Sequence, residues 1–339
     1  MLDEMRDEGL GWLRASGSPH RIGLALGQAG RATVARDLVG HPLWRTLTGP
    51  DHAARVARTA AATRARFPLI WAEIEGLAEG LALPVDQVFA WNCRGDLLAS
   101  APDGCTTVMM PGENPLLAHN EDGLPFFRGD CFIAEAQPDD QPGFHAFCYP
   151  GSIPGHTFAF TGAGLVQTVN NLRLTGVEAE IPRMVLGRAV LTAPTLDAAL
   201  EILRDAPSGG FHFSLMHKAD RRILSVEFGG GESSIREVRT PEVHANHALH
   251  LPRGLAGQIV TDSSRDRQEW GSRLVAEGRD PLEILRDTGC RGLPIRRDAA
   301  DDPDEENTLG TAVLRLTDAG LEWSIHDRAE GAARYTGTA

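Results

Sequence analysis

The residue with the clearest capacity for covalent chemistry is Cys105, which lies in the segment DGCTT at residues 103–107. A cysteine between a turn and a strand is either a reactive thiol or a small buried side chain. A thiol of this kind attacks a carbonyl carbon when a base takes its proton. A distant imidazole is a possible base, but no histidine carries the flanking sequence of a known cysteine protease.

A second candidate for chemistry is the histidine cluster EVHANHALH, in which His244, His247 and His250 recur every three residues. Metal ligands must converge on one point. On a strand, however, His244 and His250 face one way and His247 faces the other. The glycine-rich segments at 209–213 and 228–231 lack the strand–turn–helix context of a phosphate loop, so turns explain them better. We therefore expect no metal site.

The elements that position these residues change character close to Cys105. Before it, HAARVARTAAATRAR and WAEIEGLAEGL have helical periodicity. After it, extended segments separated by glycine, proline and aspartate predict strands. Two helices follow, one opening near Pro182 and one capped by Thr195, then more strands, a helical pair over about 263–288, and a hairpin around residues 318–320. This order predicts a layered α+β fold with helices outside packed sheets.

Composition limits the class of protein and its partners. The chain has 339 residues, 42% of them hydrophobic, and a formal net charge of −13. An acidic chain is a poor partner for nucleic acid or anionic lipid. The start has no apolar block of signal-peptide length, and no run is apolar enough to span a membrane, so we expect a cytoplasmic protein. Five separated cysteines indicate no disulfide framework, and we expect the acidic run at 301–307 to be a solvated loop.

Several segments together resemble one family. DGCTT and the following HNED at 119–122 are similar to the Gly-Cys processing site and next strand of isopenicillin N acyltransferase and its bacterial relatives. SGSPHRIGLALGQ, EIEGLAEGLALPVDQVFAWNCRGDL, GLVQTVNNL and VHANHAL resemble further stretches of that family in the same order. Those enzymes belong with penicillin V acylases and bile salt hydrolases among the N-terminal nucleophile hydrolases.

The resemblance implies a fold and an activation step. It implies a four-layer αββα sandwich in which residues 1–104 form a mainly helical α chain and 105–339 a catalytic β chain. Cys105 would attack the Gly104 carbonyl and shift the acyl group to sulfur, after which water would release a chain that begins at Cys105. Glycine at 104 leaves room for that approach. The new α-amine and the thiol then place base and nucleophile on one residue.

The resemblance also implies supporting residues. Asp122, 17 positions after Cys105, matches an aspartate that orients the amine of the nucleophile, and Asn246 matches an oxyanion-hole asparagine. Asn170 matches a second asparagine, with Asn171 as the fallback, and Arg265 in SSRDRQ matches an arginine that supports the nucleophile. Each has a plain alternative, namely a turn carboxylate, asparagines that satisfy backbone groups, and a surface arginine.

One position departs from bile salt hydrolases, which have arginine where this chain has His119; His119 either lines the pocket or packs in the core. The predicted activity is that of an amidohydrolase or acyltransferase acting through an acyl-Cys105 intermediate on a small-molecule amide or acyl-CoA-type substrate. No cofactor is required, and we expect the cleaved chains to stay associated, with a homo-oligomer possible. The alternatives are an unprocessed, silent relative and a small-molecule binding protein.

Overall fold

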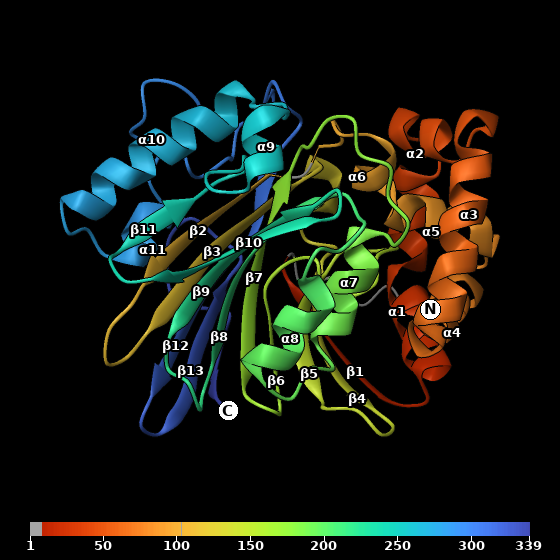
Figure 1. The fold of residues 1–339 in the computed structure, drawn as a ribbon, viewed down its shortest axis with the longest axis horizontal. Coiled ribbons are helices and arrows are strands. Elements are labelled where there is room, and N and C mark those ends of the chain that lie inside the picture. The colour runs from red at the N-terminus through yellow and green to blue at the C-terminus, as the bar shows by residue number, and fades with distance from the viewer. Residues whose placement is uncertain (1–8, 103) are drawn as a thin grey trace, which may run out of the picture.

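Two β-sheets form the centre of the computed structural model, which describes residues 9–102 and 104–339 (Figure 1). The first sheet has the order β1-β4-β5-β6-β7-β8-β9-β10 and the second β11-β2-β3-β12-β13-β14. The strands of the first sheet are β1 Gly11–Gly17, β4 Phe132–Pro138, β5 Phe144–Cys148, β6 Ala159–Thr161, β7 Leu165–Leu172, β8 Gly210–His217, β9 Ile223–Gly229 and β10 Glu232–Val238. Those of the second are β2 Gly104–Met110, β3 Leu116–Gly123, β11 Glu242–His244, β12 Asn307–Thr317, β13 Gly320–His326 and β14 Tyr335–Thr338.

The two sheets pack face to face through their central strands. Every residue of β3, β7 and β8 is buried, which requires a layer on each side of both sheets. Helices α7 (Arg183–Val190) and α8 (Leu196–Leu203) cover the outer face of the first sheet, whereas α10 (Asp262–Ala276) and α11 (Pro281–Leu285) cover that of the second (Figure 1). The predicted α+β fold with four αββα layers is confirmed.

Local signals explain most of these elements. Thr195 caps α8 by accepting a hydrogen bond from the Ala198 N–H at 3.2 Å, as predicted. Pro182 occupies the N-cap position of α7, one residue before its first turn. The predicted terminal hairpin is the pair β12–β13, in which Thr317 pairs with Gly320. Within the described residues, none of the helices combines the length and the apolarity that crossing a membrane demands.

The segment before Cys105 is mostly helical and gathers at one side of the sheets (Figure 1). Its helices are α1 Pro19–Thr33, α2 Pro42–Leu47, α3 Pro50–Arg66, α4 Pro68–Leu81, α5 Val85–Asn92 and α6 Arg94–Leu97, with a π-helical turn at Val34–Leu38. Helices α1 and α4 approach closely, because a Cβ on Gly23 would lie 1.9 Å from the Glu73 carbonyl oxygen. The short helix α9, Pro252–Ala256, lies in the second segment.

One strand of this segment was not anticipated. Strand β1 pairs in parallel with β4 and forms an edge of the eight-stranded sheet. Its sequence, GWLRASG, has half-buried and exposed positions and ends in two small residues, so its polarity pattern is weak. The pairing is specified by distant partners, such as the hydrogen bond of 2.8 Å from Trp12 Nε1 to Glu135 Oε2.

Candidate active site

Cys105 is the second residue of strand β2 and faces the space between the two sheets. It stands opposite Glu121 on β3, and Thr107, two residues further along β2, stands opposite His119. Because side chains alternate along a strand, these four lie on the inner face of the second sheet. Thr107 Oγ1 lies 2.7 Å from Asn170 Oδ1 on β7, which places this face against the first sheet.

Gly104 stands where no larger residue fits. A Cβ at this position would lie 2.5 Å from Glu306 Oε2 and 3.1 Å from Asp122 Cβ. Two carboxyl side chains therefore pack against the Gly104 backbone from the outer face of the sheet. The requirement for glycine here is steric and arises from these neighbours, not from a positive φ angle.

The backbone of Cys105 is held by Asn246 and Arg267. The Cys105 N–H donates to Asn246 Oδ1 at 2.9 Å, and the Arg267 guanidinium donates to the same oxygen at 2.7 Å and to the Cys105 carbonyl oxygen. Two donors on one atom fix the orientation of the Asn246 amide. Its Nδ2 donates to the Asn171 carbonyl oxygen at 3.3 Å, so the Asn246 amide accepts from Cys105 through oxygen and donates to Asn171 through nitrogen.

Arg267 takes the place that the sequence analysis gave to Arg265, and that prediction requires correction. Arg265 is half exposed on α10 and pairs with Asp262 at 2.7 Å, away from Cys105. Arg267 is fully buried, and burial lowers the pKa of its guanidinium while Asp122 and Glu306 oppose that shift. Residues two apart on a helix point about 200° apart, so only one arginine of SSRDRQ faces the sheet. Arg267 follows buried Ser263 by four residues, so the two side chains lie on the same face of α10. The Ser263 Oγ accepts a hydrogen bond from Arg267 Nε at 3.0 Å.

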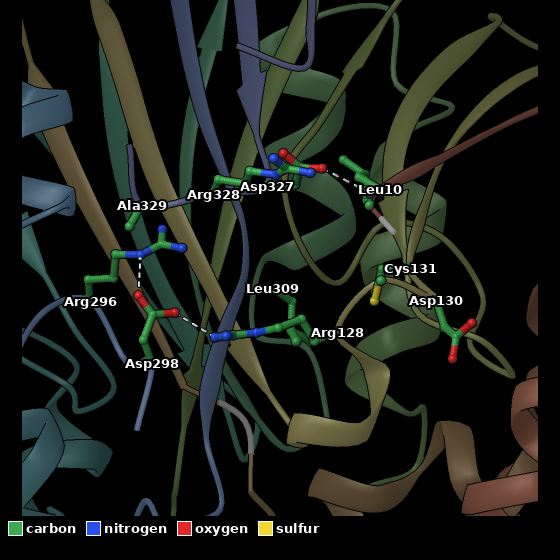
Figure 2. A pocket seen from close by; sticks show the side chains of 12 residues that line it. Leu10, Arg128, Asp130, Cys131, Arg296, Asp298, Leu309, Asp327, Arg328 and Ala329 are labelled. Atoms are coloured by element: carbon green, nitrogen blue, oxygen red, sulfur yellow. Dashed lines mark hydrogen bonds and ion pairs between the residues drawn. The ribbon is translucent and has the colours of Figure 1, made fainter. Parts of the chain in front are cut away.

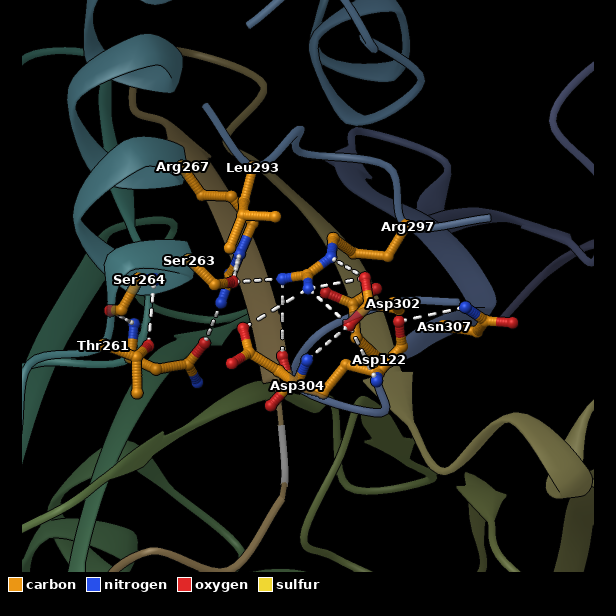
Figure 3. Close-up of polar contacts among 12 residues, drawn as sticks. Asp122, Thr261, Ser263, Ser264, Arg267, Leu293, Arg297, Asp302, Asp304 and Asn307 are labelled. Atoms are coloured by element: carbon orange, nitrogen blue, oxygen red, sulfur yellow. Dashed lines mark hydrogen bonds and ion pairs between the residues drawn. The ribbon is translucent and has the colours of Figure 1, made fainter. Parts of the chain in front are cut away.

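Asp122 lies on the outer face of the sheet, close to Arg267 (Figure 3). Its Oδ1 accepts a hydrogen bond from Thr308 Oγ1 at 2.6 Å. Among the residues that the structure describes, none donates to Asp122 Oδ2, which is buried. Burial raises the pKa of this carboxyl, and the nearby positive charges of Arg267 and Arg297 act in the opposite direction.

The acidic run at 301–307 was predicted to be solvated, and that expectation is wrong for part of it. Arg297 donates to both carboxylate oxygens of Asp302, at 2.7 and 2.6 Å, and to Ser263 Oγ on α10 (Figure 3). Glu306 is buried and accepts from Arg173 at 3.1 Å. Asp302 is thus paired with an arginine five residues before it and Glu306 with one 133 residues before it, and neither partner belongs to the acidic run itself.

The thiol side of the site contains two residues that the sequence analysis missed. Cys105 Sγ lies 3.5 Å from Glu121 Oε2, and Tyr149 donates to Glu121 Oε1 at 2.6 Å. His119 Nε2 lies 3.1 Å from the same Oε2, and burial lowers the pKa of His119 to about 3, so its ring is neutral. Glu121 belongs to the segment HNED. Side chains alternate between the two faces of β3, so Glu121 shares a face with His119, and the pairing of β2 with β3 places it opposite Cys105. No pattern in the sequence indicated Tyr149.

The two candidate asparagines of β7 lie in different places. Asn170 faces Thr107 between the sheets and donates to the His244 carbonyl oxygen at 3.1 Å. Asn171 offers its carbonyl oxygen to Asn246 and its side-chain oxygen to Arg183. The fallback, Asn171, is therefore the one that contacts the Asn246 side chain next to Cys105.

The histidine cluster does not converge. His244 Nε2 contacts Glu227 at 2.8 Å, His247 Nδ1 contacts Ser264 at 2.8 Å, and His250 lies between two serines. Among the described residues, the set close enough to share an ion is Cys105, His119 and Glu121, whose ligand atoms lie within 4.8 Å of one another. Their mutual hydrogen bonds account for that spacing, so we assign no ligands.

A large pocket lies at a different part of the described molecule. It has a volume of about 760 Å³, and its lining includes Leu10, Cys131 and two arginines, Arg128 and Arg296, that pair with Asp298 (Figure 2). Asp298 accepts from Arg296 Nε at 2.7 Å and also from Arg128. Its lining contains none of the residues at Cys105.

The sequence profile of the family described as acyl-coenzyme A:6-aminopenicillanic acid acyl-transferase matches residues 109–330, more than half of the chain. The chain belongs to this family. The matched range begins four residues after Cys105 and includes Asp122, Asn246 and Arg267. The predicted resemblance is confirmed at the level of the family.

Two further proteins are similar to this member of the acyl-transferase family. Beta-alanyl-dopamine/carcinine hydrolase of Drosophila melanogaster is 25% identical over 236 residues, which are 62% of this chain and 59% of that protein. This chain thus spans less than two thirds of its length. A variant of conjugated bile acid hydrolase from Clostridium perfringens aligns over 69% of this chain and 97% of its own, at 11% identity and a TM-score of 0.38, which is too low to carry an argument. The family is described by an acyl-transferase activity and the Drosophila relative by a hydrolase activity.

Proposed function

We propose that this chain is a self-processing cysteine amidohydrolase or acyltransferase that cleaves itself between Gly104 and Cys105. The observation that carries the proposal is the hydrogen bond of 2.9 Å from the Cys105 N–H to Asn246 Oδ1. That nitrogen is the atom that becomes the α-amine after cleavage. A site that already binds it, beside a buried thiol and a buried guanidinium, is suited to an N-terminal cysteine nucleophile.

The activation step follows from the arrangement around Gly104. The thiol attacks the Gly104 carbonyl carbon, and the acyl group moves from the Cys105 nitrogen to its sulfur. Water then hydrolyses the thioester and leaves a carboxyl on Gly104 and a free amine on Cys105. Arg267, which donates to the Cys105 carbonyl oxygen, holds this residue in place during the shift.

In turnover, the new α-amine acts as the base for the thiol of the same residue. Unperturbed, an α-amine has a pKa of about 8 and a thiol of about 8.5, so a proton passes readily between them. Asn246 and Asp122 orient the amine, while Asn246 Nδ2, an amide donor that contacts the Asn171 carbonyl oxygen at 3.3 Å, lies next to the position of the developing oxyanion. The substrate's acyl group rests on Cys105 as a thioester and passes to water or to an amine.

The proposed substrate is a small-molecule amide or an acyl thioester. The family description names acyl-coenzyme A and 6-aminopenicillanic acid as the pair between which an acyl group is transferred, and the Drosophila relative is named as a hydrolase of beta-alanyl-dopamine and carcinine. Both reactions run through the same thioester, because the two acceptors differ only in the nucleophile that attacks it. Apart from the substrate and water, every proposed step uses groups of the chain itself.

After cleavage we expect the two chains to remain together. Strand β1, from the first chain, stays paired with β4 of the second along seven residue pairs. Asp96 in the first chain accepts hydrogen bonds from the backbone N–H groups of Arg183 and Gly209 in the second. These contacts do not depend on the Gly104–Cys105 peptide bond.

A second candidate is an unprocessed protein that binds a small molecule without chemistry. The observation that favours it is the burial of Cys105, which is 3% exposed inside a strand that begins at Gly104. In that case Cys105 keeps its peptide bond and the thiol stays silent.

Intact-mass measurement under denaturing conditions separates the two candidates. The wild type is compared with Cys105→Ala prepared in the same way. We expect the wild type to yield fragments that end at Gly104 and begin at Cys105, while the variant stays whole. A separate native sample of the cleaved protein is then treated with iodoacetamide. A label on Cys105 that abolishes turnover supports the acyl-enzyme. If the wild type and Cys105→Ala both stay whole, the binding protein is favoured.

A further inference from the structure

The activation step needs a base that turnover does not need. In the uncleaved chain the Cys105 nitrogen belongs to the peptide bond with Gly104, so the α-amine does not yet exist. An amide nitrogen is not a base at neutral pH, and some other group must take the thiol proton. This inference rests on the proposed self-processing and concerns its first step.

Among the residues that the structure describes, Glu121 provides a carboxyl in contact with the thiol. Glu121 stands directly opposite Cys105 in the β2–β3 ladder, and its Oε2 lies 3.5 Å from Cys105 Sγ. Both side chains are buried, at 2% and 3% exposure. A general base must lie within hydrogen-bond reach of the proton that it takes, and Glu121 meets that condition in the uncleaved chain.

We propose that Glu121 is the general base of self-cleavage, with His119 and Tyr149 as the residues that position it. Each of these two residues contacts a different carboxyl oxygen: His119 Nε2 lies 3.1 Å from Oε2, and Tyr149 Oη donates to Oε1 at 2.6 Å. The carboxyl is thereby fixed with one oxygen toward the thiol.

Two neighbouring groups donate to the Glu121 carboxyl. Tyr149 Oη donates to Oε1 at 2.6 Å, and the Cys105 thiol faces Oε2 at 3.5 Å. On the other side of His119, Thr107 Oγ1 donates to Asn170 Oδ1 at 2.7 Å and lies 2.9 Å from His119 Nδ1. Hydrogen bonds donated to a carboxyl favour its ionised form.

The hydrogen bonds of the site can also adapt to a protonated Glu121. Tyr149 Oη lies 3.3 Å from the Asp122 carbonyl oxygen, an alternative acceptor for its proton once Glu121 is neutral. A base that must both take and return a proton requires stable surroundings in both states.

The step balances as follows. The Sγ proton passes to Glu121 Oε2, and the thiolate forms a C–S bond with the Gly104 carbonyl carbon. Glu121 returns the proton to the Cys105 nitrogen as the C–N bond breaks, which gives the thioester and a free amine. Water adds its hydroxyl to the Gly104 acyl carbon and its remaining proton to sulfur. The carboxyl of Glu121 is regenerated.

The rival carboxyl is Glu306, which packs against Gly104 from the other face of the sheet. It is bound by Arg173 at 3.1 Å and lies 3.6 Å from Arg297, so two guanidinium groups hold its charge. Cys105 and Glu306 lie on opposite faces of β2, which disfavours direct proton transfer between them.

The test follows the rate of cleavage in full-length chain made by cell-free synthesis. Wild type, Glu121→Gln, Glu306→Gln and the surface control Glu201→Gln are incubated between pH 7 and pH 9, and the fragment beginning at Cys105 is quantified. We expect Glu121→Gln to be at least about tenfold slower at pH 7, and its rate to rise about tenfold per pH unit because hydroxide must replace the base. Wild type and Glu201→Gln should show a much flatter profile.

Other outcomes are equally defined. Cleavage of Glu121→Gln at the wild-type rate and with the wild-type pH profile overturns the inference, as does selective loss in Glu306→Gln. Loss of wild-type cleavage in EDTA overturns it in favour of a metal at Cys105, His119 and Glu121. If wild type itself stays whole, the proposed function fails instead, which is a distinguishable result.

A second variant covers the case in which Glu121→Gln does not fold. Tyr149→Phe keeps the aromatic ring but removes the donor to Glu121 Oε1. We expect a slower cleavage whose pH midpoint moves upward, because a carboxylate that loses a donor is protonated more easily. A purely structural role would lower the yield without moving the midpoint, and an unmoved midpoint contradicts the inference.

Discussion

Arg188 and Glu73 form a buried ion pair between the segments on either side of Gly104–Cys105. Arg188 Nε lies 3.0 Å from both carboxylate oxygens of Glu73, and the two side chains are 1% and 0% exposed. Arg188 comes from α7 over the first sheet and Glu73 from α4 in the helical segment. The proposed cleavage leaves this pair intact.

Removing the carboxylate of Glu73 should therefore weaken the association of the two chains. Glu73→Gln leaves a buried guanidinium without its counter-charge, which costs about 3–5 kcal/mol. We expect a large drop in the thermal midpoint and separation of the chains at lower urea concentration, measured by size-exclusion chromatography. Glu201→Gln, which breaks an exposed pair with Arg204, is the control and should change stability by less than about 1 kcal/mol. Equal stability of both variants would contradict the role of the buried pair.

Substitution at the scissile glycine should block cleavage through packing. In Gly104→Ala the new methyl group meets Glu306 Oε2 at 2.5 Å, so the strand or the carboxyl must shift. We expect cleavage to slow by at least about tenfold, since small displacements of reacting groups cost that much. Gly40→Ala, at a position with no atom within 4 Å, is the matched control. Normal cleavage of Gly104→Ala would show that the carboxyl moves aside at little cost.

Arg265 and Arg267 of α10 should behave differently. Arg267→Gln removes the donors to the Cys105 carbonyl oxygen and to Asn246, and we expect cleavage and turnover to fall by about 100-fold or more, comparable with the loss of a preorganised donor. Arg265→Gln removes only a surface pair and should retain wild-type rates. Mass spectrometry of the fragments and circular dichroism of both variants check the rate and the fold. A defect in Arg265→Gln alone would restore the original assignment.

Acid should destabilise the fold through buried histidines. Burial lowers the pKa of His250 to about 4, below its unfolded value, so its contribution to stability is complete above about pH 6.5 and is lost as the pH falls toward 4. Because the His250 ring is partly exposed and solvent screens its charge, we expect a loss smaller than about 3 kcal/mol between pH 7 and pH 4. We expect His250→Gln in a Cys105→Ala background to lose less unfolding free energy over this range than its parent, measured by urea titration. Parallel losses in the two proteins would contradict this assignment.

Much of the architecture is encoded locally, and the exceptions have a common cause. The cap at Thr195 and the β12–β13 hairpin depend on neighbours in sequence, and both were predictable. Strand β1 was not, because it is defined by its pairing with β4 more than 100 residues later. Asp302 and Glu306 were read as solvated because their arginine partners come from outside the acidic run.

The site divides in the same way. Cys105 and Asn246 follow from motifs, and the structure brings them into direct contact. Choosing Arg265 over Arg267 failed because the two differ only in the direction in which α10 presents them to the sheet. Glu121 was within a quoted motif, but its position opposite the thiol emerges only when β2 and β3 are aligned.

The contacts around Cys105 also set an order of events during protein synthesis. Asn246 and Arg267 lie 141 and 162 residues after Cys105. A ribosome exposes Cys105 well before it has made either of them, so the nascent chain passes through a long interval in which the scissile bond lacks its surroundings. The proposed cleavage would therefore mark completed synthesis, since chains that stop early or fold incorrectly would keep an uncut bond. The length of the fragment that begins at Cys105 reports that the whole protein was made and assembled.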